Sequence, residues 1–164
     1  MKLVINLRTL LIALWLGAAL FFSFAVAPSA FAALPSRELA GAVVNRTLSI
    51  INYAGSITGL ILLASAFAIP GREKGVRFWF EQALLVVLTA SCAIGQFVIA
   101  ARLRGLREQI GRPIDEIAAD DPLRIAFNDL HGYSVIILSI AMFAAIIIFF
   151  LISERKRSAG IWWK

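Results

Sequence analysis

The sequence predicts an all-α integral membrane protein built as a bundle of four transmembrane helices. Hydrophobic residues make up 60% of its 164 residues and charged residues only 16%, whereas a soluble domain is roughly half apolar and about a quarter charged. The apolar residues also gather in four stretches, each close to the roughly 20 residues that a helix needs to cross the hydrocarbon core. These stretches cover residues 9–27, 47–69, 78–101 and 132–152, and Glu81 is their only charged residue. We expect one membrane domain over 1–164, with an outer connector at 102–121 and an inner basic tail at 153–164.

The first stretch leads into Ala30-Phe31-Ala32, a small-x-small triplet of the kind that a signal peptidase cleaves. The apolar region of a signal peptide is about 7–15 residues long, and here the apolar character continues to Leu34. We therefore expect this helix to be retained as a membrane anchor. Pro28 and Pro35 would then mark its end and the turn into the next helix.

The second and fourth helices are predicted to extend beyond the membrane on the outer side. Ser36 begins a helical pattern that continues to Ile69, where Pro70-Gly71 ends it. A helix of that length measures about 51 Å at 1.5 Å per residue, which exceeds a hydrocarbon core of about 30 Å. It must project or bend near Gly41. Asp121-Pro122 places a capping residue before proline and gives the fourth helix a similar extension.

The third stretch opens with Phe78-Trp79-Phe80, of which Trp79 suits the aromatic belt at a membrane interface. It is followed by Arg102–Asp120, a charged connector that glycine and proline interrupt and in which a short amphipathic helix can form.

The charge distribution predicts that both termini are cytoplasmic. Nine Lys and Arg residues fall on the side that holds the termini and seven on the other, where seven of the ten acidic residues also lie. Basic residues collect on cytoplasmic loops, so this topology explains the net charge of +6 better than nucleic-acid binding does. We expect residence in a cell membrane, most simply a bacterial inner membrane. The expected partners are the lipid bilayer and either further copies of the chain or other membrane proteins.

Polar residues follow one face of the second helix and one of the third. Steps of three and four residues align Asn45, Ser49, Asn52, Ser56 and Gly59, and steps of seven align Gln82, Thr89 and Gln96. Helices in lipid associate through small residues and interhelical hydrogen bonds, so both faces are explained by helix packing. The alternative is a polar lining for a substrate path, for which Asn52 and Gln96 are the candidates.

Ionisable residues in membrane segments are the usual indicators of function. Glu81 is a candidate proton or cation site, although it can also snorkel, stabilise the helix start or pair with Arg77. His131 is the only histidine and is either a titrating group or a hydrogen-bonding anchor at the outer edge. We also hypothesise that Arg46 and Asp129 form an ion pair between helices two and four at the outer rim, the alternative being two independently solvated charges.

Two segments resemble a known family. The N-terminal "LWLGAALFFSFAVAPSAFAALPSRELAGAVVNRTL" and the later "FNDLHGYSVIIL" are similar to a small bacterial membrane family of unknown function related to the transmembrane protein 205-like domain. The matching positions are Ala27, Pro28, Phe31, Leu34, Arg37, Ala40, Gly41, Phe127, Leu130, His131 and Ser134. The segment "TLSIINY" departs from it where many relatives carry Phe-Pro. The resemblance implies four spans and an uncleaved first helix, without a mechanism.

The motifs indicate no catalytic residues, metal site or cofactor. The sequence has no Ser/His/Asp set, metal-spaced cluster or phosphate-binding glycine loop. A haem-binding oxidoreductase is the least supported alternative, because a haem bundle usually needs two axial ligands, whereas His131 and Met142, the one methionine besides the initiator, share a helix. We predict a non-catalytic scaffold or stress-related membrane component, with a small transporter or channel subunit as the main alternative.

Overall fold

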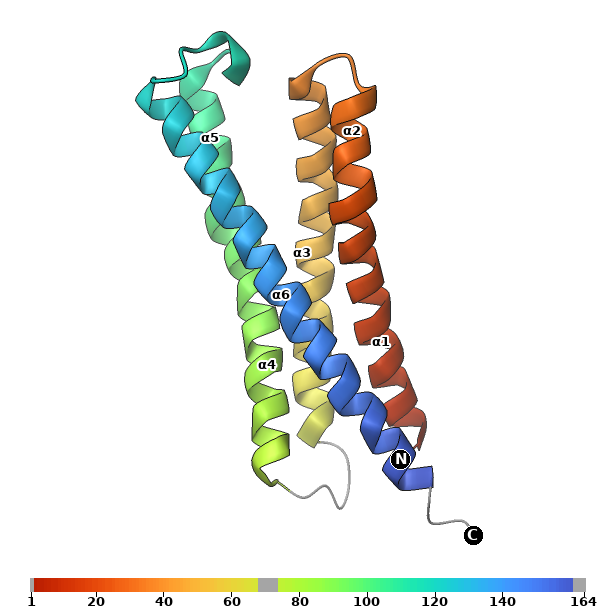
Figure 1. Cartoon of the computed structure of the whole chain (residues 1–164). Coiled ribbons are helices and arrows are strands. Elements are labelled where there is room, and N and C mark those ends of the chain that lie inside the picture. Colours follow the sequence, from red (N-terminus) through yellow and green to blue (C-terminus); the bar gives the residue numbers. More distant parts are fainter. Residues whose placement is uncertain (1, 68–73, 161–164) are drawn as a thin grey trace.

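The chain folds into four long helical rods (Figure 1). The computed structural model describes residues 2–67 and 74–160, the last six by their backbone alone. The first rod joins α1 and α2 through a π-helical turn, and the third joins α4 and α5 in the same way. The elements are α1 (Lys2–Phe21), a π-turn (Phe22–Val26), α2 (Ala27–Ala33), α3 (Arg37–Phe67), α4 (Val76–Ala93), a second π-turn (Ile94–Ile99), α5 (Ala100–Ile110), a 3₁₀ turn (Ile114–Glu116) and α6 (Pro122–Gly160).

The predicted all-α four-helix bundle is confirmed. Each rod is long and apolar enough to cross a membrane. Large apolar side chains face outward on all of them, including Leu14, Ile57, Phe97 and Phe143, which is the surface that lipid requires. The chain is thus a multi-pass membrane protein.

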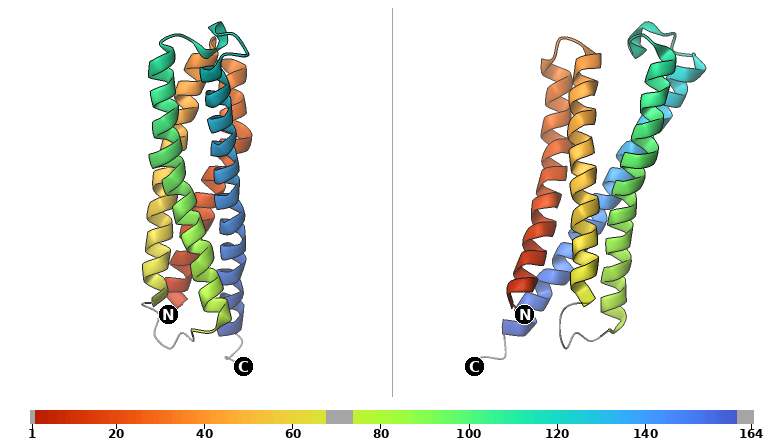
Figure 2. Two further views of the ribbon diagram at one scale, coloured as in Figure 1. Left: turned by 90° about the vertical axis from the view of Figure 1, so that its left-hand side faces the viewer. Right: turned by 180° about the vertical axis from the view of Figure 1, so that it is seen from behind.

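The rods form two helical hairpins, one from α1 to α3 and the other from α4 to α6. Helix α3 contacts α1, α2 and α4, whereas α6 contacts α1, α4 and α5. Helices α3 and α6 therefore occupy opposite corners of the bundle. The hairpins lie close together at the end that holds both chain termini, here called the terminal end, and diverge at the opposite, connector end (Figure 2).

Close helix contacts hold the two hairpins together in the half of the bundle nearer the terminal end. A Cβ atom added to Gly59 of α3 would lie 2.1 Å from the Thr89 hydroxyl of α4, and one added to Gly55 would lie 2.5 Å from Cys92 Sγ. The indole of Trp15 in α1 donates a hydrogen bond to the Ile51 carbonyl at 3.0 Å. Small residues thus let α3 approach α1 and α4, as the packing interpretation of the α3 polar face predicts.

The first rod does not end at Pro28. Instead, the hydrogen-bond ladder shifts by one residue just before the proline, where the Ala27 amide bonds to the Phe22 carbonyl. Proline has no amide hydrogen and crowds the preceding turn, and a π-turn accommodates the strain without ending the helix. The rod then ends at Ala33, so Ala30-Phe31-Ala32 lies within a helix rather than in an exposed turn.

The helix starts follow the predicted capping residues. Ser36 Oγ accepts a hydrogen bond from the Leu39 amide at 3.2 Å, and Asp121 Oδ1 accepts one from the Leu123 amide at 2.8 Å. These side chains satisfy amide groups that a helix start leaves without partners.

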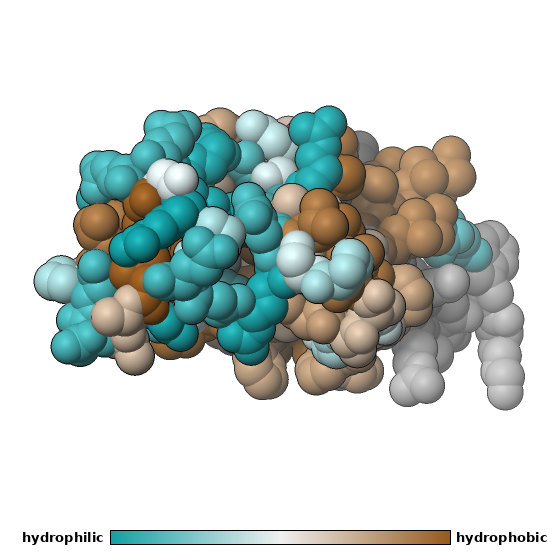
Figure 3. Space-filling view, turned by 90° about the horizontal axis from the view of Figure 1, so that it is seen from above, coloured by the Kyte–Doolittle hydropathy of each residue, from teal (hydrophilic) through white to brown (hydrophobic). Residues whose placement is uncertain are grey.

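The connector between the third and fourth rods is shorter than expected. Residues 102–110, predicted to belong to it, continue the helix as α5, which ends where Gly111 adopts a positive φ of 63°. Leucine, arginine and glutamine favour the helix here. Side chains at the connector end are mostly hydrophilic above α5 and the connector (Figure 3). The predicted helix stop at Pro70-Gly71 and residues 161–164 of the basic tail lie outside the described residues.

Candidate functional site

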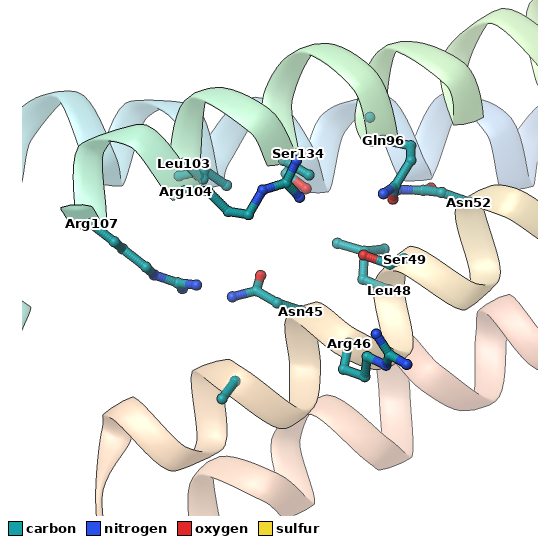
Figure 4. Close-up of a pocket in the computed structure, with 13 residues that line it drawn as sticks. Asn45, Arg46, Leu48, Ser49, Asn52, Gln96, Leu103, Arg104, Arg107 and Ser134 are labelled. Atoms are coloured by element: carbon teal, nitrogen blue, oxygen red, sulfur yellow. The ribbon is translucent and has the colours of Figure 1, made fainter.

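A cavity of about 260 Å³ lies where the two hairpins begin to diverge (Figure 4). Its walls come from α3, from the π-turn Ile94–Ile99 with α5, and from Ser134 of α6. The described lining residues are Ala42, Asn45, Arg46, Leu48, Ser49, Asn52, Gly95, Gln96, Ala100, Leu103, Arg104, Arg107 and Ser134. Both candidates for a polar substrate path, Asn52 and Gln96, are among them.

The polar face of α3 has two different roles along its length. Towards the terminal end, Gly55 and Gly59 pack against α4. Towards the connector end, where α5 has moved away from α3, Asn45, Ser49 and Asn52 line the cavity instead. The packing and lining interpretations each describe one half of the same face.

The second π-turn positions Gln96 at the floor of the cavity. Asn52 is 4% exposed and Gln96 6% exposed, and their side chains lie side by side (Figure 4). Gly95 makes this approach possible, because a Cβ atom there would lie 3.1 Å from Asn52 Nδ2. A π-turn also rotates the following residues relative to a regular α-helix, and such turns are frequent at functional sites.

Two polar atoms in the cavity wall lack hydrogen-bond partners. Within the described part of the chain, neither Asn45 Nδ2 nor Gln96 Oε1 is hydrogen-bonded, although both atoms are buried. A buried polar group without a partner costs about 1–3 kcal/mol. Most buried polar groups in proteins are satisfied, so the floor of this cavity is a place where a bound molecule or water would be stabilised.

Three arginines line the cavity on the side nearer the connector end, away from the floor formed by Asn52 and Gln96. Arg104 extends from α5 towards Ser134, and Arg107 extends towards Asn45 (Figure 4). Arg46 lies on α3 at the edge. No acidic residue belongs to the described lining. The site thus combines neutral donors and acceptors at its floor with cationic groups above them.

Comparison with known proteins identifies the family. Residues 10–112 match the family model described as "Domain of unknown function (DUF4149)", which is more than half of the chain. The chain belongs to the DUF4149 family. All the described lining residues of the cavity except Ser134 fall within the DUF4149 segment. No curated protein and no solved structure matches the chain.

A second polar cluster lies at the terminal end. It connects Arg8, which precedes the DUF4149 segment, to residues within that segment. Arg8 of α1 forms an ion pair with Glu81 of α4 at 2.7 Å, and the two side chains are 3% and 1% exposed. Arg8 also donates hydrogen bonds to the Leu62 carbonyl and to the hydroxyl of Ser65, both on α3. One guanidinium therefore ties three helices together.

This cluster decides between the structural alternatives considered for Glu81. Arg77, the partner in one of them, instead bonds to Glu154 at 2.8 Å and to the Leu151 carbonyl of α6. Glu81 is buried rather than snorkelling because its side chain faces α1, where Arg8 supplies the compensating charge. Sequence reasoning missed Arg8 because it precedes the apolar stretch and was counted only as a topology signal. Gln82, next to Glu81, is also buried, and neither side-chain atom has a hydrogen-bond partner among the described residues.

The other predicted site residues lie apart. His131 is exposed near the start of α6. Arg46 and Asp129 are both exposed, and the ion pairs between described residues do not include this one. The reason is the diagonal placement of α3 and α6 together with the divergence of the hairpins at the connector end. At that end the structure instead pairs Arg37 with Asp115 at 3.3 Å.

Proposed function

We propose that this chain is a membrane-embedded binding protein for a small polar solute, of the transporter or channel-subunit class. The observation that carries the proposal is the cavity between the hairpins, whose buried floor holds Asn52 and Gln96 and leaves Gln96 Oε1 without a partner among the described residues. Polar groups at membrane depth that are not hydrogen-bonded within a helix are tolerated mainly where they line a cavity or bond to other parts of the protein. A solute or water in the cavity would bond to these groups.

The scaffold interpretation does not require this cavity. A protein that only holds partners together needs an outward apolar surface and close helix packing, which every multi-pass membrane protein has. It gains nothing from buried amide groups without partners, since each one destabilises the fold. The solute-binding proposal explains the two such atoms that line the cavity, Asn45 Nδ2 and Gln96 Oε1, so we favour it over the scaffold and assign the chain no catalytic step.

The haem alternative receives no support from the geometry. His131 is exposed, whereas Met142 is partly buried and its sulfur accepts a hydrogen bond from Ser23 at 3.9 Å. Both residues belong to α6, so within one chain they do not face each other across a bundle interior as axial ligands do.

The proposed setting is a bacterial inner membrane with both termini in the cytoplasm, supported by the Lys and Arg bias. The cavity would then open towards the outer side. We keep the resemblance to the transmembrane protein 205-like domain as part of this proposal, supported by the two sequence segments that carry it.

The proposal is tested by ligand-induced stabilisation of the purified protein. The parent chain and the N52L/Q96L variant are heated in neutral detergent with a panel of small solutes: inorganic anions, carboxylates, sugars, amino acids and amines. We expect at least one solute to raise the melting temperature of the parent, since a ligand at 100 times its Kd stabilises by about 2.7 kcal/mol. We expect no such rise in the variant, whose floor has lost both amides.

The matched control is Gln82→Leu, which removes a buried amide of the same α4–α5 rod outside the cavity. It should leave ligand stabilisation intact. If no solute stabilises the parent, or if the floor variant responds as the parent does, the cavity is not a binding site and the proposed function is wrong.

A further inference from the structure

The described charged residues that line the cavity are all positive. Three guanidinium groups line it, those of Arg46, Arg104 and Arg107, and its described lining holds no carboxylate. In the described part of the chain, none of these three arginines forms an ion pair. By contrast, the buried Arg8 at the terminal end is compensated by Glu81. A group of uncompensated cations over a buried polar floor attracts negative charge.

Arg107 is held in place across the opening between the hairpins. Its guanidinium stacks over the Phe127 ring of α6 at 5.2 Å, a contact that stabilises a cation. The far end of its side chain lies beside α3, 3.6 Å from the position of a Cβ atom on Gly41. Glu38, which lies one turn before Gly41, attracts the Arg107 charge. Arg107 thus reaches the cavity from the opposite hairpin in a defined orientation.

The atoms around the cavity match the needs of an oxyanion. Arginine presents its N–H groups in a planar fork that binds carboxylate or phosphate oxygens in pairs. Asn45 adds a buried donor, its Nδ2 group, that lacks a partner within the described residues, and Figure 4 shows Arg107 directed towards it. Ser49 and Ser134 add hydroxyls on opposite walls. Donors are in surplus, which suits the oxygens of a phosphate or carboxylate group. The one buried lining acceptor without a partner among the described residues, Gln96 Oε1, can accept a hydrogen bond from a P–O–H group or a water.

We infer that the cavity binds a small oxyanion, a phosphate or carboxylate group, with Arg104 and Arg107 as its main charged partners. This inference rests on the proposed function and names the substrate class of the same site. The Asn52 and Gln96 amides form the neutral floor beneath the anion, and Arg46 supplies positive charge at the edge. Phosphate chemistry has two sources in a membrane, free phosphate and the head group of an anionic phospholipid, and the test separates them.

The test compares a charge-removing variant with a matched control. R104Q/R107Q removes two cations that line the cavity, Arg104 being exposed and Arg107 half-buried, whereas R102Q/R112Q removes two exposed cations of the same region that do not line it. Both variants lose the same net charge. Binding of inorganic phosphate is measured by calorimetry in neutral detergent. Binding of fluorescent phosphatidylglycerol is measured in phosphatidylcholine nanodiscs.

We expect phosphate to bind the parent, and affinity to fall about tenfold or more for each arginine removed, since hydrogen bonds to charged groups are the strong ones. R102Q/R112Q should change it less than threefold. Phosphate binding in detergent identifies a free anion as the ligand. Phosphatidylglycerol binding that depends on Arg104 and Arg107, without binding of free phosphate, identifies the lipid head group. Either result supports the inference.

Two outcomes of this comparison overturn the inference. One is binding that both double variants weaken equally, which would reflect general surface charge. The other is the absence of binding to both probes. If R104Q/R107Q does not fold, R104K/R107K keeps the charge but loses the guanidinium fork, and unchanged affinity in that variant also contradicts the inference. If a neutral or cationic solute stabilises the parent and loses its effect in N52L/Q96L but not in R104Q/R107Q, the oxyanion inference fails while the proposed function stands.

Discussion

Breaking the buried ion pair at the terminal end should be among the most destabilising single changes in this protein. Glu81→Gln keeps the shape of the side chain but leaves the Arg8 guanidinium, 3% exposed, without the carboxylate at 2.7 Å. A guanidinium stays charged under all ordinary conditions. Removing one partner of a buried pair costs about 3–5 kcal/mol, because the other charge stays buried and uncompensated. Arg8→Met should cost a similar amount, since it removes the Arg8 charge from Glu81 and loses the bonds to Leu62 and Ser65.

Replacing both partners should restore most of this stability. A well-packed apolar pair of similar volume is often neutral or stabilising relative to a buried ion pair, so R8M/E81L should lie near the parent. The single variants of the cycle are Arg8→Met and Glu81→Leu, and Glu81→Leu should cost as much as Glu81→Gln because it removes the same carboxylate. If these changes were independent, their sum would be about 6–10 kcal/mol, and the cycle therefore predicts a coupling of several kcal/mol. The assay is reversible unfolding in mixed micelles with increasing fractions of denaturing detergent, followed by circular dichroism.

The control is the exposed pair of Arg77 and Glu154, whose side chains are 43% and 64% exposed. Exposed pairs contribute about 0–1 kcal/mol, so Arg77→Gln should be nearly silent. The reasoning is refuted if Glu81→Leu and Arg8→Met each cost less than about 1 kcal/mol, or if their effects simply add to give R8M/E81L. Such additivity would mean that water reaches both charges.

Two further predictions concern helix packing. Gly59→Ala should destabilise the bundle by about 1–3 kcal/mol, because its Cβ would lie 2.1 Å from the Thr89 hydroxyl. Adding Thr89→Ala to this variant should relieve the clash. The control is Gly132→Ala, whose Cβ would meet nothing within 4 Å and which should be neutral or stabilising in the same unfolding assay. Trp15→Phe should cost about 1 kcal/mol through loss of its hydrogen bond to the Ile51 carbonyl, and an unchanged unfolding midpoint would show that this bond contributes nothing.

The cap positions and the polar faces were predictable because they depend on local chemistry. Asp121 and Ser36 act on amides two and three residues away, and a three- and four-residue spacing puts Asn45, Ser49 and Asn52 on one face whatever the helix packs against. By contrast, the continuation of the first rod past Pro28 was not predictable. It depends on a shift in the hydrogen-bond ladder that proline permits but does not require.

The candidate site was only partly predictable. The sequence identified Asn52 and Gln96, but not that they would meet, since that depends on the π-turn at Ile94–Ile99 and on the absence of a side chain at Gly95. Arg104 and Arg107 were counted as connector charges. They line the cavity because residues 102–110 continue the helix and carry these side chains back to the bundle.

By itself, the sequence determined that the chain is helical, that it crosses a membrane and that it has four spans, because lipid demands long apolar segments with internally satisfied backbones. The tertiary structure alone decided which charges are paired. Arg8 and Glu81 are far apart in the chain and lie on the diagonal helices α1 and α4, and they meet because both side chains are buried inside the bundle at the terminal end. Arg46 and Asp129 also lie on diagonal helices, α3 and α6, but both are exposed and stand at the end where the hairpins diverge, so they do not form an ion pair. Helix formation follows from neighbouring residues, but the pairing of charges depends on how the rods pack, which no local pattern encodes.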